Sequence, residues 1–263
     1  MESIDLQGVP ETMLQTLYAR AAHSKRPDRK FYDVKAIEIM EQLDYDFSKA
    51  EKDMAMSAGV IARTILLDKM VGDFVKENPK GTVVNIACGL DTRFYRVDNG
   101  RIRWYNLDLP ETIAVRRRFL TETGRVSMIA KSAMDETWAD DIDETENRTL
   151  IVMEGLVMYL TEADVKQILS IIDRRFRSAK VIMETMNPWI VKHMKEKSIE
   201  ATRAKFTWGI KSGKDLKNLA PGFTWVRDVS LTEGMKVIYP VYRLLGGIPA
   251  VRNISNKLVI LEK

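Results

Sequence analysis

The chain has 263 residues, of which 45% are apolar, and a formal net charge of +4. This length and apolar fraction suit one α/β domain of ordinary size, and no apolar run approaches the ~20 residues that cross a bilayer, so no membrane segment is predicted. Lysines and arginines are scattered among nearly as many acids, which argues against a nucleic-acid-binding surface. Their densest group, Arg116 to Arg118, falls within a predicted helix and is interpreted as part of a solvated face.

One cysteine and two histidines limit the chemistry that the chain offers. Cys88 has no second cysteine to pair with, and the first residues lack the basic start and apolar block of a secretory signal, so we expect a cytoplasmic protein. A buried, unreactive Cys88 is favoured over a reactive thiol, because no partner motif containing histidine accompanies it. His23 and His193 lack the spacing of metal ligands, and no metal site is predicted.

Three helices are predicted before the first core strand. Apolar residues recur at helical spacing in residues 11–22, 34–43 and 52–78. The polar segment 23–30 is expected to be a loop, and Asn-Pro-Lys-Gly at 78–81 is a strong stop and turn signal. A helical region is therefore expected to precede the first core strand.

The first core strand is predicted at residues 82–86. Val83, Val84 and Ile86 are β-branched, which suits a strand buried on both faces of a parallel sheet. Just beyond it, Gly89 lets the backbone turn sharply and bring its N–H groups close to a ligand, since no Cβ intervenes. A ligand is therefore expected above the end of this strand.

The turn around Gly89 does not match a nicotinamide or flavin dinucleotide site. That fingerprint needs three glycines, and the corresponding positions are Ala87, Gly89 and Thr92. Asp91 also places a carboxylate where a pyrophosphate would lie, so a cationic or zwitterionic nucleoside fits better. Two roles remain open for Asp91: binding an ammonium group, directly or through water, or accepting hydrogen bonds from the backbone of its own turn.

Two further acids end apolar stretches. Asp108 follows Gly89 by 19 residues, at the tip of the second expected strand, where a carboxylate is placed to accept both hydroxyls of a ribose. The alternative is an acid at a helix N-terminus beside Pro110. Glu154 ends the strand expected at residues 150–153 in the same way and is the third acidic candidate for the site.

Strands and helices alternate through the rest of the chain. We expect helices at 110–122, 162–176 and 231–236, strands at 127–130, 150–153, 180–185, 223–229 and 257–261, a helical stretch from Trp189 to about Phe206, and a loop at 245–249. Thr161, with Asp164 three residues on, has the pattern of a capping box at the start of the helix after residue 161.

Three segments resemble the leucine carboxyl methyltransferase family, and within it the polyketide O-methyltransferases: CGLDTRFYRVDNGRIRWYNLDLPE, SAMDETW and EGLVMYL. The likeness extends from about residue 12 to about residue 189. It implies a class I S-adenosylmethionine-dependent methyltransferase fold, an α/β domain with a seven-stranded, mostly parallel sheet. The expected organisation is a helical cover over 1–78, a cofactor-binding core over 79–187, a helical insertion over 188–222 and C-terminal strands over 223–263.

The resemblance implies S-adenosylmethionine as the cofactor and assigns residues to it. The implied cofactor-binding residues are Arg20, Arg63, Gly89, Asp91, Asp108, Leu109, Ala133, Met134 and Glu154. The arginine that matches Arg63 contacts the methionine carboxylate in the family, and a bidentate guanidinium suits that task. Ala133 and Met134 would flank the adenine, and Glu154 would lie near the ammonium or sulfonium end. The alternatives are an exposed arginine at position 20 and a surface ion pair at position 63.

Three aromatic residues are weaker candidates on the substrate side. They are Tyr18, Tyr159 and Trp189, and ordinary core packing is the alternative for each. Ala87 departs from the family pattern, in which many relatives carry glycine, and a methyl group is expected to be tolerated there.

The predicted reaction is methyl transfer to an oxygen of a small-molecule carboxylate or hydroxyl. An ionised carboxylate needs no general base, whereas a phenol would benefit from one, and no catalytic residue is assigned. Two alternatives remain: a methyltransferase acting on a protein C-terminal carboxylate, and a cofactor-binding protein without turnover. No oligomeric state is assigned.

Overall fold

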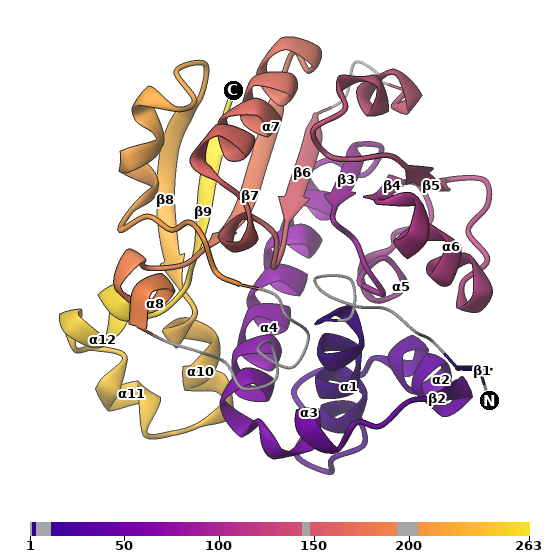
Figure 1. Cartoon of the computed structure of the whole chain (residues 1–263), viewed down its shortest axis with the longest axis vertical. Coiled ribbons are helices and arrows are strands. Elements are labelled where there is room, and N and C mark those ends of the chain that lie inside the picture. Colours follow the sequence, from indigo (N-terminus) through magenta and orange to yellow (C-terminus); the bar gives the residue numbers. More distant parts are fainter. Residues whose placement is uncertain (1, 4–11, 144–147, 194–204) are drawn as a thin grey trace.

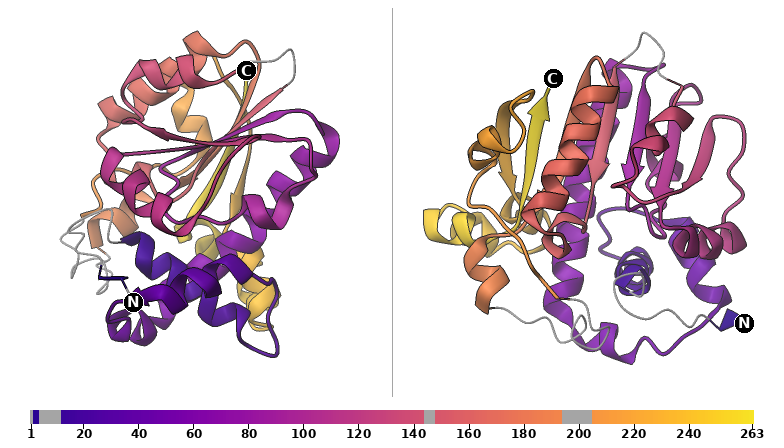
Figure 2. Two further views of the ribbon diagram at one scale, coloured as in Figure 1. Left: turned by 90° about the vertical axis from the view of Figure 1, so that its right-hand side faces the viewer. Right: turned by 45° about the horizontal axis from the view of Figure 1, so that its top comes forward.

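The computed structural model describes residues 2–3, 12–143, 148–193 and 205–263. Over these residues one sheet of seven strands forms, in the order β5-β4-β3-β6-β7-β9-β8. Its strands are β3 (Thr82–Ile86), β4 (Arg103–Asp108), β5 (Val126–Ala130), β6 (Thr149–Met153), β7 (Ala179–Thr185), β8 (Thr224–Ser230) and β9 (Lys257–Glu262). The sheet is central to the molecule, with helices on both of its faces (Figure 2).

Parallel pairing brings the carboxyl ends of the central strands together. Ile86 of β3 is opposite Leu107 of β4 on one side and Met153 of β6 on the other. Only β9 is antiparallel to its neighbours β7 and β8 among the described strands of this sheet. The predicted seven-stranded, mostly parallel sheet is therefore confirmed.

The amino-terminal helices lie at the carboxyl ends of the central strands. They are α1 (Thr12–Ser24), α2 (Val34–Gln42), α3 (Ser48–Lys52) and α4 (Met54–Glu77). Helices α1 to α3 lie below the sheet in Figure 1, while the longer α4 rises from them along one face. A short parallel pair that the sequence did not predict, β1 (Glu2–Ser3) and β2 (Leu43–Asp44), accompanies them.

An apolar cluster packs against each face of the sheet, and smaller clusters lie among the amino-terminal helices. Strand β3 is buried along its whole length, as predicted, and contributes Val84 and Ile86 to one cluster and Val83 to the other. Helix α7 (Glu162–Arg175) packs in the first cluster and α4 in the second. Because β3 is covered on both faces, its carboxyl end is held rigidly.

The remaining helices are shorter. They are α5 (Phe94–Val97), α6 (Pro110–Phe119), α8 (Pro188–His193), α10 (Thr232–Ile238), α11 (Tyr242–Leu245), α12 (Pro249–Ile254) and the 3₁₀ turns η2 (Glu136–Asp141), η3 (Val157–Tyr159) and η4 (Gly213–Asn218). The helical stretch expected from Trp189 is seen as α8, and residues 194–204 of it lie outside the described residues. The expected loop at 245–249 separates two short helices that were not predicted.

Local signals at two helix boundaries were correct. The capping box formed by Thr161 and Asp164 is present at the start of α7. Helix α4 ends at Glu77, directly before the predicted stop. Among the described helices, none has both the length and the apolar character that a bilayer crossing requires.

Candidate functional site

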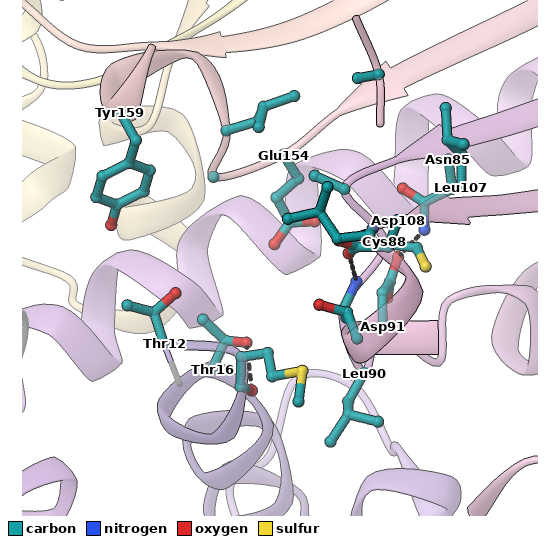
Figure 3. Close-up of a pocket in the computed structure, with 18 of the residues that line it drawn as sticks. Thr12, Thr16, Asn85, Cys88, Leu90, Asp91, Leu107, Asp108, Glu154 and Tyr159 are labelled. Atoms are coloured by element: carbon teal, nitrogen blue, oxygen red, sulfur yellow. Dashed lines mark hydrogen bonds between the residues drawn. The ribbon is translucent and has the colours of Figure 1, made fainter. Parts of the chain in front are cut away.

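A cavity of about 240 Å³ lies at the carboxyl ends of β3, β4 and β6, with α1 across from them. In the view of Figure 3, Thr12 and Thr16 of α1 face the strand ends, and Glu154 lies between Tyr159 and Asp108. All nine residues assigned to the cofactor from the sequence line it: Arg20, Arg63, Gly89, Asp91, Asp108, Leu109, Ala133, Met134 and Glu154. Residues from six separate parts of the chain are thus brought to one cavity.

The three aromatic candidates lie in different places. Tyr159 lines the cavity, whereas Tyr18 and Trp189 are not among its lining residues. Tyr18 stacks on Phe47, with ring centroids 5.3 Å apart, beside α3. Trp189 of α8 is 52% exposed and stacks on the ring of His193.

The turn after β3 has two residues in the left-handed region. Gly89 has a φ of +46°, and a Cβ built there would lie 3.0 Å from Cβ of Met13 in α1. Glycine is thus needed both for the turn and for the close approach of the first helix. Ala87 has a φ of +56°, which is uncommon for a residue with a side chain, so its methyl group is accommodated with backbone strain.

Asp108 ties the end of β4 to this turn. Its Oδ2 accepts a hydrogen bond from the Gly89 N–H at 2.7 Å, and its Oδ1 accepts one from the Leu109 N–H at 2.8 Å. Each carboxylate oxygen has a second lone pair, so the group retains the capacity to accept hydroxyl donors from a ligand. Burial raises the pKa of Asp108 above its usual value, although these backbone donors oppose the shift.

Arg63 lies between two carboxylates from neighbouring strands. Its Nε is 2.7 Å from Oε1 of Glu154, which follows β6, and its Nη1 donates to Oε2 of Glu184 in β7 at 2.9 Å. The side chain of Arg63 is 13% exposed, so the alternative of a surface ion pair is wrong. Burial raises the pKa of Glu154, but Arg63 and Arg93 outweigh it and hold that pKa below the usual value.

Arg20 is also buried. Its side chain is 3% exposed, its Nε lies 3.1 Å from Oδ2 of Asp33, and its Nη2 donates to the Leu90 carbonyl at 2.7 Å. The alternative of an exposed arginine is therefore wrong. The guanidinium lies at the cavity wall and connects α1 with the turn after β3.

Asp91 accepts hydrogen bonds from its own turn. The backbone N–H of Arg93 donates to Oδ1 at 2.9 Å, and Nη1 of the same arginine donates to Oδ2 at 2.6 Å. Asn85 of β3 donates to Oδ2 as well, at 3.0 Å. Burial raises the pKa of Asp91, but Arg93 and Arg96 bring it well below the usual value, so this carboxylate is ionised at neutral pH.

Sequence reasoning missed Arg116 as a residue of this region. Its side chain is fully buried, its Nη1 donates to the carbonyls of Gly89 at 2.9 Å and Asp91 at 2.8 Å, and its Nη2 lies 2.5 Å from Glu122. Arg117 and Arg118 are exposed, as predicted. The interpretation of all three as a solvated face is thus wrong for the first, because three successive arginines do not show which one faces the protein.

Glu184 was missed although its position carried a signal. Like Asp108 and Glu154, it is an acid near the carboxyl end of a buried apolar strand. Asp33 was missed too. It is the N-cap residue of α2, and its Oδ2 accepts from Nη1 of Arg96 at 2.6 Å. Nothing in the sequence around Asp33 indicates this pairing.

The charged groups of the cavity have both signs at one end. Arg20, Arg63, Asp91 and Glu154 lie above β3 and β6, while Asp108 lies above β4 on the other side of β3. Paired cations and anions suit a zwitterionic group, and an ionised carboxylate over the second strand suits ribose hydroxyls.

Residues 13–173 match the family profile described as leucine carboxyl methyltransferase. The chain belongs to the leucine carboxyl methyltransferase family. It is 35% identical to the tetracenomycin polyketide synthesis O-methyltransferase TcmP of Streptomyces glaucescens, over 88% of this chain and 86% of that protein. It is 26% identical to the S-adenosyl-L-methionine-dependent methyltransferase dpfgK of Gibberella zeae, over 84% of this chain and 82% of that protein.

Solved structures agree at the level of the fold. The magnesium protoporphyrin IX methyltransferase of Synechocystis PCC 6803 superposes with a TM-score of 0.52 at 8% identity, covering 88% of this chain and 100% of that one. As a member of its family, the chain is an S-adenosylmethionine-dependent methyltransferase, related to polyketide O-methyltransferases. The cavity fits this cofactor, because an acid at the end of β4 suits ribose hydroxyls and the charges of both signs suit an amino-acid end.

Proposed function

We propose that this methyltransferase acts on an oxygen of a small-molecule carboxylate or hydroxyl. One observation carries the proposal: a single cavity joins Asp108, the charged groups at Arg63 and Glu154, and an apolar wall. The apolar wall consists of Met13, Leu156, Leu160 and Ile168, beside Tyr159. The relationship to a polyketide O-methyltransferase over most of both chains supports an acceptor of this class.

The strand order supports one orientation for the cofactor. Adenine would lie over the loop after β5, flanked by Ala133 and Met134, and the ribose would bind Asp108 after β4. The amino-acid end would then lie above β3 and β6, where Arg63 and Glu154 are. Because β5, β4, β3 and β6 are consecutive in the sheet, an extended ligand meets these groups in this order.

The residues that line the cavity would position the cofactor and the acceptor rather than supply an acid or a base. When bound, S-adenosylmethionine would supply the methyl group of its sulfonium to an acceptor oxygen, with S-adenosylhomocysteine as the leaving group. The apolar wall beside Tyr159 excludes water, and the ion pairs of Arg63 hold its guanidinium in place. Holding donor and acceptor at near contact can supply about 7–11 kcal/mol of the barrier. A carboxylate acceptor is already ionised at neutral pH and so needs no general base.

Calorimetric titration with S-adenosylhomocysteine tests the cofactor site. Asp108→Ala removes the proposed ribose ligand, and we expect at least about a tenfold loss of affinity, since a hydrogen bond to a charged group contributes ~1.5–3 kcal/mol. Glu111→Ala is the matched control, because Glu111 is an exposed acid three residues away on α6. Unchanged affinity in Asp108→Ala would contradict this placement of the ribose.

A methyl-acceptor screen tests the substrate class. Radiolabelled S-adenosylmethionine is incubated with the protein and with aromatic carboxylic acids, phenols, or a peptide that ends in leucine. We expect label in a carboxylic acid or a phenol. Label in the peptide alone would contradict the proposal and favour a protein carboxyl acceptor.

A further inference from the structure

Glu184 is a buried carboxylate that lies behind the cavity. Its side chain is 1% exposed, near the end of β7, and it is not among the residues that line the cavity. Three groups donate to it: Nη1 of Arg63 at 2.9 Å, the backbone N–H of Gly155 at 2.9 Å and Nδ2 of Asn256 at 3.2 Å. It therefore accepts from α4, from the turn after β6 and from the residue before β9.

One oxygen of Glu184 fixes two parts of the cavity wall. Arg63 and Gly155 both line the cavity, and both donate to Oε2. Gly155 has a φ of +63°, and a Cβ built there would lie 3.5 Å from Nη1 of Arg63, so guanidinium and turn are in contact. The position of Oε2 thus determines where the guanidinium lies relative to the turn.

The charge of Glu184 matters as well as its shape. Taking a carboxylate out of water is unfavourable, and a buried ion pair gives weak net stabilisation compared with apolar packing. Glu154 binds two guanidinium groups at once, with Nε of Arg63 2.7 Å from its Oε1 and Nη2 of Arg93 2.6 Å from its Oε2. Glu184 supplies the second anchor from the neighbouring strand.

We propose that Glu184 is a positioning residue for the amino-acid end of the cofactor. It orients Arg63 and the Gly155 N–H at the end of the cavity above β6 and does not itself touch the ligand. The proposal rests on the proposed function, because it takes the amino-acid end of S-adenosylmethionine to lie there.

Two ligands separate positioning from general stability. S-adenosylhomocysteine carries the amino-acid end, whereas 5′-methylthioadenosine shares the adenosine and lacks that end. In Glu184→Gln, which removes the charge and keeps the shape, we expect the dissociation constant of S-adenosylhomocysteine to rise about tenfold. The dissociation constant of 5′-methylthioadenosine should change less than about twofold. Both are measured by calorimetric titration.

Two further variants sharpen the experiment. Glu184→Asp keeps the charge and shortens the side chain by one methylene. We expect the dissociation constant of S-adenosylhomocysteine to rise selectively again, but by less than in Glu184→Gln. If Glu184→Gln does not fold, Glu184→Asp provides the test. Glu262→Gln is the control, because Glu262 is a partly exposed acid on the adjacent β9. It should change neither dissociation constant.

Equal losses for both ligands, or no loss for either, would overturn the proposal. The first outcome would show that Glu184 supports the fold only, and the second that Arg63 keeps its position without it. A parent protein that binds 5′-methylthioadenosine but not S-adenosylhomocysteine would also overturn it. A parent protein that binds neither would instead contradict the proposed function.

Discussion

Asp108 can accept hydrogen bonds fully at both of its oxygens only when it is ionised. A carboxylate accepts hydrogen bonds at both oxygens, whereas a protonated carboxyl loses part of that capacity. The backbone N–H groups of Gly89 and Leu109 already donate to it. Burial nevertheless raises the pKa of Asp108, so its protonation begins closer to neutral pH than that of an ordinary aspartate.

Binding of S-adenosylhomocysteine is therefore expected to weaken as the pH falls through the raised pKa of Asp108. The sign follows because the acceptor form exists above the pKa. Asp91 and Glu154 have lowered pKa values and stay ionised over this range, so they do not contribute to the loss. Calorimetric titration from neutral to acidic pH measures the effect. Asp108→Asn should bind more weakly and show a flatter profile, and a profile parallel to that of the parent would contradict this origin.

At the scale of elements, α6 presents adjacent arginines to different surroundings. Arg116 is fully buried against Glu122 and donates to carbonyls in the turn after β3, while Arg117 is exposed. A helix rotates by about 100° per residue, so neighbouring side chains can point into different surroundings. Helix α6 thus supports the turn through one side chain.

We expect Arg116→Met to lower the free energy of unfolding by about 3–5 kcal/mol, because it leaves the buried carboxylate of Glu122 without its cation. Arg117→Met, one residue away, should change it by less than about 0.5 kcal/mol. Urea denaturation followed by circular dichroism measures both. Similar values for the two variants would show that the ion pair of Arg116 contributes little.

At the scale of the whole molecule, the amino-terminal helices are tied to the sheet through the cavity. Met13 of α1 packs against Gly89, and Arg20 donates to the carbonyl of Leu90. Asp33, which begins α2, pairs with Arg96 in the short helix after the turn. A ligand in the cavity would therefore contact the helical cover and the sheet together.

Ligand binding should stabilise both parts. At a concentration 100-fold above its dissociation constant, S-adenosylhomocysteine should raise the free energy of unfolding by about 2.7 kcal/mol. Hydrogen exchange followed by mass spectrometry should show slower exchange in α1 as well as in residues 87–109. The Asp108→Ala variant at the same ligand concentration serves as the control. Protection confined to residues 87–109 would contradict a role for α1 in holding the ligand.

Local patterns in the sequence were sufficient for much of the fold and part of the cavity. The period and branching of residues 82–86 predicted β3, the glycine at 89 predicted the turn, and the spacing of Asp108 placed it over the next strand. Parallel strands end at one edge of the sheet, so acids after successive strands had to gather there. The capping box at Thr161 likewise depends on residues close in sequence.

Contacts between distant residues needed the tertiary structure. Arg63 and Glu184 are 121 residues apart, and no local period relates a residue in a cover helix to one in the fifth core strand. The burial of Arg116 depends on what packs against α6, which its composition does not specify. Tyr18 and Trp189 were chosen as aromatic residues on predicted helices, but helical spacing says nothing about which cavity a helix faces. Sequence alone thus determined the seven strands of the main sheet, the longer helices and the strand ends that carry charge, because those signals are local. The tertiary structure decided which charges meet and which are removed from water, because pairing and desolvation depend on the packing of the whole chain.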